Sequence, residues 1–197
     1  MAETPTSKLI VIAVICAVLF FLALTLLEAI PEIPVDIDFK AFFIPLAFVA
    51  LLPVGAPTFA VALGAALGEL LRDMLEGYEI DDPIGTIGYV VGFVLAGYII
   101  GNRPLSKARL IAAGVGSGFA HAVIEASSFL LFSKETVEIA IWSAMGNTIT
   151  HGVIMGAIPL LFLVPRLHGR IERYMGFAPH RQDRPQPLPQ GAHATAR

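Results

Sequence analysis

Long apolar stretches alternate with short polar connections along most of the chain. The apolar stretches predict six helical segments, at residues 8–30, 39–53, 57–76, 85–102, 107–132 and 137–166. The connections between them are rich in Pro, Gly and Asp, which favour turns. A hydrocarbon core about 30 Å thick needs roughly 20 apolar residues per helix, so this pattern predicts an all-α membrane protein, a compact bundle of six transmembrane helices.

The positive charges predict how the bundle is oriented. They gather between the fourth and fifth segments and after the sixth, at Arg103, Lys107, Arg109, Arg166, Arg170 and Arg173. Basic residues favour the cytoplasmic side, so both sites are expected there, and an even number of spans places both termini in the cytoplasm. We expect a multi-pass protein of the plasma membrane.

Composition supports this picture and limits the function. The chain has 197 residues, of which 56% are hydrophobic and 15% charged, which is too apolar for a soluble domain. We expect a transmembrane domain at residues 1–173, and a disordered cytoplasmic tail, rich in Pro, Gln, His and Arg, at residues 174–197. A net charge of −3 argues against nucleic acid as a partner.

Small residues recur one helical turn apart in several segments, as in Gly64 and Gly68. Such spacing lets helix backbones approach closely inside a membrane. In the first segment Ala13 and Ala17 have the same spacing. They form either a flat face for a partner helix or an internal packing contact.

Polar side chains inside the predicted helices are candidate site residues, because an unpaired charge in a membrane helix costs several kcal/mol. By position they fall at the bilayer midplane or in its outer half. The candidates for substrate binding are Glu69, Arg72, Tyr78, His121, Glu125, Trp142, Asn147 and His151. Asp73 and Glu76 are instead expected to be interfacial charges at a helix end.

The spacing of these candidates predicts a pocket open to the outside. Residues three or four apart share a helix face, as His121 and Glu125 do, so three polar faces can converge. Trp142 and Tyr78 would offer flat surfaces for a ring. Other roles stay open: His121 pairs only with Glu125, Asn147 packs two helices, or Trp142 anchors the outer interface. Glu69 and His151 are the strongest candidates.

Few catalytic motifs are present. The sequence has no Gly-rich phosphate loop, so any ATP must act through a partner, and it has no His-Glu-x-x-His zinc motif. A divalent metal among His121, Glu125, His151 and Glu69 remains an open alternative. We expect no enzymatic activity and no cofactor.

Several motifs within residues 8–167 carry a resemblance to a known family. They are Ala13-x-x-x-Ala17, Ile44-Pro45-Leu46, Gly55-Ala56-Pro57, Gly64 with Gly68, Glu69-Leu70-Leu71-Arg72-Asp73, Gly85-Thr86-Ile87-Gly88-Tyr89 and Gly97-Tyr98-Ile99-Ile100-Gly101. Together they resemble the substrate-binding membrane subunits, or S components, of energy-coupling factor (ECF) vitamin transporters. Ala56 departs from the direct Gly-Pro that is common in that family.

The resemblance implies a subunit that captures a vitamin or related micronutrient from outside. It further implies a membrane coupling subunit, on which Ala13 and Ala17 would dock, and two ATP-hydrolysing subunits. The excess of acidic over basic candidates favours a cationic or neutral heteroaromatic substrate. The alternatives are a stand-alone ion-coupled carrier or channel, and an intramembrane metal-dependent enzyme using His121, Glu125 and His151.

Overall fold

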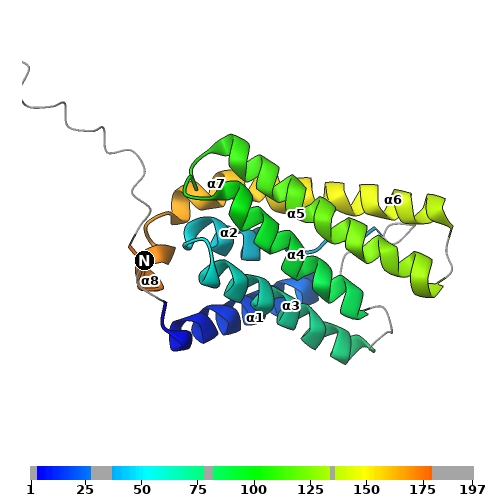
Figure 1. Cartoon of the computed structure of the whole chain (residues 1–197), viewed down its shortest axis with the longest axis horizontal. Helices are drawn as coiled ribbons and strands as arrows, with labels where there is room; N and C mark the ends of the chain where they lie inside the picture. The colour runs from blue at the N-terminus through cyan, green and yellow to red at the C-terminus, as the bar shows by residue number, and fades with distance from the viewer. Residues whose placement is uncertain (1–3, 28–36, 78–81, 134–135, 179–197) are drawn as a thin grey trace, which may run out of the picture.

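The computed structural model describes residues 4–27, 37–77, 82–133 and 136–178, which form helices and short connections with no β-strand among them. The long helices lie side by side along the longest axis of the molecule (Figure 1). In chain order the elements are α1 (Thr6–Leu27), α2 (Phe43–Leu51), α3 (Ala56–Glu76), α4 (Asp82–Ile100), α5 (Lys107–Ser128), the π-helix η1 (Phe129–Ser133), α6 (Val137–Asn147), the π-helix η2 (Thr148–Ala157), α7 (Ile158–Leu167) and α8 (Ile171–Tyr174).

Within the described residues, four helical stretches are long and apolar enough to cross a membrane: Thr6–Leu27, Asp82–Ile100, Lys107–Phe132 and Val137–Leu167. The last of these joins α6, η2 and α7. The all-helical prediction is confirmed. The remaining two predicted segments correspond to α3, which has 21 residues but carries several charges in its last turns, and to α2, which has only nine residues.

Large apolar side chains cover much of the outside of the bundle. Examples are Leu22, Leu67, Ile87, Phe119, Ile141 and Phe162, each at least half exposed. Soluble monomers rarely expose contiguous apolar surface on this scale. The surface and the four long apolar helices therefore fit a membrane protein.

Small residues bring α1 and α3 into backbone contact. A Cβ atom added at Gly64 would meet the carbonyl of Ala13, and one added at Gly68 would lie 2.6 Å from the Ala17 carbonyl oxygen. Ala17 is buried in this contact. Of the two alternatives for Ala13 and Ala17, the structure shows the internal packing contact with α3, and the docking of a partner subunit stays a prediction.

Close backbone contacts at glycines also join the helices on the other side of the bundle. A Cβ at Gly92 of α4 would lie 2.8 Å from the Ser117 carbonyl oxygen of α5. A Cβ at Gly118 of α5 would lie 2.5 Å from the backbone nitrogen of Gly152 in η2. The predicted close packing through recurring glycines is confirmed for these helix pairs.

The second predicted segment is only partly helical. Residues 37–41 precede α2 without helical structure, and Ala41 and Phe42 are fully buried. Buried non-helical backbone needs protein partners, and the Asp38 N–H donates to Asn147 Oδ1 at 3.2 Å. The extended segment, residues 37–41, thus lies against α6 in the interior of the bundle.

The end of the described chain folds back onto its beginning. Tyr174 closes α8, Met175 is buried, and the Lys8 ammonium donates to the Gly176 carbonyl at 2.8 Å. Residues 174–178, which were predicted to start a disordered tail, therefore contact the bundle in the structure. The rest of that prediction concerns residues 179–197, which lie outside the described residues.

Candidate functional site

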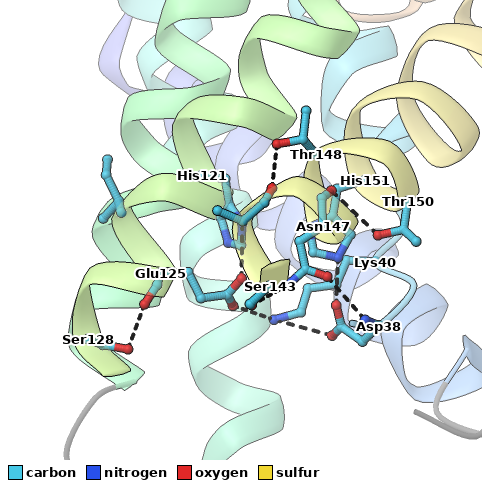
Figure 2. A network of polar contacts seen from close by, with 12 residues as sticks. Asp38, Lys40, His121, Glu125, Ser128, Ser143, Asn147, Thr148, Thr150 and His151 are labelled. Atoms are coloured by element: carbon cyan, nitrogen blue, oxygen red, sulfur yellow. Dashed lines mark hydrogen bonds and ion pairs between the residues drawn. The ribbon is translucent and has the colours of Figure 1, made fainter. Parts of the chain in front are cut away.

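A buried lysine holds three carboxylates together inside the bundle. Lys40, in the extended segment, is 9% exposed. Its ammonium lies 3.0 Å from Glu69 Oε1 of α3, 3.1 Å from Glu125 Oε1 of α5 and 3.6 Å from Asp38 Oδ2. Figure 2 shows the Lys40 ammonium between the Asp38 and Glu125 carboxylates. Three elements far apart in sequence thus meet at one charge.

A histidine from η2 joins this cluster through the extended segment. His151 is fully buried, and its Nε2 lies 2.6 Å from Asp38 Oδ1. Asn147, one turn earlier, accepts the backbone N–H of Asp38. The extended segment is therefore held by two residues of the Val137–Leu167 stretch.

A second histidine lies on the facing helix. His121 of α5 is also fully buried, and its Nδ1 is 3.5 Å from Glu125 Oε2, one turn along the same helix. Neither ring nitrogen of His121 makes a hydrogen bond within the described part of the chain, and the same holds for His151 Nδ1 and Glu125 Oε2. Buried polar atoms usually have partners, so these four atoms need an explanation.

Aromatic rings enclose the two histidines. The Phe42 ring stacks on His151 with centroids 5.0 Å apart, and the Tyr89 ring lies 4.1 Å from His121. The two imidazoles themselves are 5.5 Å apart, centroid to centroid. Packing against rings on several sides fixes both imidazoles and keeps the space between them small.

The outer edge of the cluster is an ion pair on α3. Arg72 Nε lies 2.6 Å from Glu76 Oε1, and Arg72 Nη1 lies 3.9 Å from Glu69 Oε1. Glu76 was expected to be an interfacial charge, and in the structure it forms the ion pair with Arg72. Arg72 connects it to the buried Glu69.

Most of the predicted site residues come together. The structure places Glu69, His121, Glu125, Asn147 and His151 in one cluster, with Arg72 at its edge. Trp142 of α6 is 55% exposed, as the alternative role of an interface anchor requires, and its stacking on a ligand stays a prediction. Tyr78, the other predicted stacking residue, lies outside the described residues.

Sequence reasoning missed Asp38 and Lys40. Both precede a short apolar stretch, where charges normally mark the start of a helix at the interface. A lysine inside the predicted segment 39–53 was the available signal, because a buried ammonium requires carboxylate partners and the other segments supply them.

The cluster carries an excess of negative charge. Three carboxylates face one ammonium, which leaves two negative charges when both histidines are neutral. One possible ligand atom from each of His121, Glu125 and His151 lies within 4.8 Å of the others. The arrangement can therefore hold a cation, and its donors include nitrogen as well as oxygen.

Fold and site together define a class, a helical protein with stretches long and apolar enough to span a membrane and a buried charged cluster. Over residues 11–196 the chain matches a protein family described as a family of unknown function, DUF8171. The match covers nearly the whole chain, so the protein belongs to this family. No curated protein and no solved structure matches the chain.

Proposed function

We propose that this protein is a membrane-embedded substrate-capture subunit of an importer of the ECF type. The carrying observation is the buried cluster built on Lys40, because it gathers charges from the extended segment, α3, α5 and η2 at one place. Charges are brought into the interior of a membrane protein at substantial cost and usually mark a binding site or pathway.

The position of the cluster supports capture from outside. Glu69 and His121 both lie in the second half of their helices, α3 and α5. The basic residues Arg103, Arg109 and Arg166 lie at the opposite ends of the helices. If the basic end faces the cytoplasm, the cluster is on the outer side of a six-span protein with both termini inside.

The charge excess supports a positively charged micronutrient as the substrate. Two uncompensated negative charges in a buried site favour a cation over an anion or a neutral ring. The capture subunit would carry no catalytic role itself. A coupling subunit and two ATP-hydrolysing subunits would complete the importer.

One measurement tests substrate capture directly. The full chain is purified in detergent from cells grown in rich medium, and native mass spectrometry measures what remains bound. We expect a bound species at one per chain in the unmodified protein and in Glu138→Gln, which changes an exposed carboxylate of α6. We expect its loss in Glu69→Gln. Equal occupancy in both variants would contradict the proposed site.

A stand-alone ion-coupled carrier is the second candidate. It is favoured by the two irregular stretches beside the cluster, residues 37–41 and η2, because carriers often bind substrate where membrane helices are interrupted. Proteoliposomes holding this chain alone distinguish the two. Accumulation of the identified ligand driven by a proton or sodium gradient supports the carrier, whereas binding without accumulation supports the capture subunit.

A further inference from the structure

We propose that His121, Glu125 and His151 bind a divalent transition-metal ion, and that Asp38 orients His151 for this role. The inference concerns ion binding inside this chain and does not depend on the proposed coupling subunits. It begins from the three side chains that meet in the aromatic enclosure of Phe42 and Tyr89.

The geometry is close to that of a metal centre. One ligand atom from each of the three residues lies within 4.8 Å of the others. Four tetrahedral ligands about 2.1 Å from an ion lie about 3.4 Å from each other. Small side-chain rotations thus bring all three donors to bonding distance. His121 and Glu125 come from one face of α5 and His151 from the facing η2 (Figure 2).

The unpartnered atoms of the cluster are the atoms that a metal would use. Both nitrogens of His121, Nδ1 of His151 and Oε2 of Glu125 make no hydrogen bond to the described residues. A buried polar atom without a hydrogen bond is energetically unfavourable. A single ion accepts one lone pair from each of these three side chains and removes most of that cost.

Asp38 supplies the support that a metal-bound histidine normally has. Its Oδ1 lies 2.6 Å from His151 Nε2, so His151 carries its proton on Nε2 and donates it to the carboxylate. The lone pair is then on Nδ1, the unpartnered nitrogen. Histidine ligands of metals almost always donate their other N–H to a carboxylate, a carbonyl or water.

The charge of the cluster indicates a divalent ion. Lys40 contacts Asp38, Glu69 and Glu125, which leaves two negative charges around it. A divalent cation neutralises both. Lys40 and the metal need not compete, because Lys40 contacts Oε1 of Glu125, whereas Oε2 makes no hydrogen bond and lies 3.5 Å from His121 Nδ1.

The donor set selects among divalent ions. Two imidazole nitrogens and one carboxylate oxygen suit Zn²⁺, Co²⁺ or Ni²⁺, whereas Mg²⁺ and Ca²⁺ prefer oxygen ligands alone. The proposal therefore predicts binding of the first group in preference to the second.

The test uses the full chain with a histidine-free affinity tag. His180 and His193, near the C-terminus, are replaced by Gln so that they cannot bind the probe. After chelator treatment the protein is titrated with Co²⁺, and the metal content and the visible absorption of Co²⁺ are measured. We expect one Co²⁺ per chain with a micromolar or lower Kd, ligand-field bands of nitrogen coordination, and no displacement by excess Mg²⁺.

Variants locate the site. His151→Gln should raise the Kd at least about 100-fold, and Asp38→Asn about 10- to 100-fold, as outer-shell changes do. His168→Gln is the matched control, because His168 follows α7 nearly five helical turns from His151. It should bind Co²⁺ as the unmodified protein does.

Two results would overturn the proposal: no stoichiometric Co²⁺ or Zn²⁺ in the unmodified protein, or unchanged binding when His121 and His151 are both replaced by Gln. The first result needs no variant, so it stands even if a variant fails to fold. A bound organic molecule without metal would retain the capture function and reject the metal site. Metal binding without import would support the metal site and reject the capture function.

Discussion

The positive charge of Lys40 allows the three carboxylates of the cluster to be buried. Three carboxylates lie within 3.6 Å of its ammonium, and without it they would repel each other in a medium that screens charge poorly. Breaking a buried ion pair by removing one partner costs about 3–5 kcal/mol. We expect Lys40→Met to lower the free energy of unfolding by that amount, measured by denaturant titration in micelles.

The matched control is Lys107→Met, which removes an exposed ammonium at the start of α5 and should have little effect. A second variant isolates the interaction. Lys40→Met combined with Glu69→Gln removes one of the repelling charges, so it should recover part of the lost stability. An additive loss in the double variant would show that Lys40 does not act through these carboxylates.

The sequence predicted which ionisable residues within apolar helices belong to the site. Glu69, His121, Glu125 and His151 were predictable because an ionisable group in such a helix must be paired. The partner Lys40 was missed because a charge beside a helix end has an ordinary interfacial explanation, although its place inside the predicted segment 39–53 was an available signal. The role of Trp142 stayed open between ligand contact and interface anchor, since the pattern around it does not distinguish the inner face of α6 from its exposed side.

Among the elements, the contact between α1 and α3 depends on the absence of side chains at Gly64 and Gly68. A Cβ at Gly64 would clash with the backbone of Ala13, and backbone cannot rotate away. We expect Gly64→Ala to destabilise the protein by about 1–3 kcal/mol, the usual cost of overpacking, measured by the same titration.

Gly85→Ala is the comparison for this change. Gly85 also lies in a helix, α4, but its nearest neighbour would be Glu125 Oε1 at 3.9 Å, an ordinary contact. This substitution should be neutral or slightly stabilising because Ala favours helix. Equal losses in both variants would mean that general helix effects, and not the α1–α3 contact, determine the result.

Asn147 holds the extended segment to α6. Replacing it by Leu removes the acceptor for the Asp38 N–H, and a lost buried hydrogen bond costs about 1–3 kcal/mol. We expect Asn147→Leu to lower stability by this amount and to increase amide exchange at residues 37–41, measured by hydrogen exchange. Thr148→Ala, whose hydroxyl bonds only within its own helix, should leave that exchange unchanged.

Element boundaries were predictable where a glycine ends the helix. The segment predicted at residues 57–76 matches α3, because Gly55 and Gly77 flank it with φ values of 117° and 122° that other residues rarely adopt. The extended start of the second segment was not predictable, since its apolar residues suit a helix equally well. The π-helix η2 continues the pattern of α6 without a break, and its glycines Gly152 and Gly156 contact α5.

For the whole molecule, the distribution of charge is the property that the function requires. The basic residues follow α4 and α7, whereas Asp82 and Glu138 begin α4 and α6 at the other end. Because α4 and α5 run in opposite directions, the basic end of α4 and the basic start of α5 lie at the same end of the bundle. A site between the midpoint and the acidic end is then closer to one end of the bundle than to the other.

Labelling of single cysteines tests which end of the bundle faces the outside of the cell. Cys16, which is buried, is replaced by Ala, and either Lys107→Cys or Glu138→Cys is added. A membrane-impermeant maleimide should label Glu138→Cys in intact cells and Lys107→Cys only after lysis, because Lys107–Phe132 separates the two positions by one crossing. The reverse result would place the cluster on the cytoplasmic side and contradict capture from outside. Labelling of both positions in intact cells would mean that this stretch does not cross the membrane.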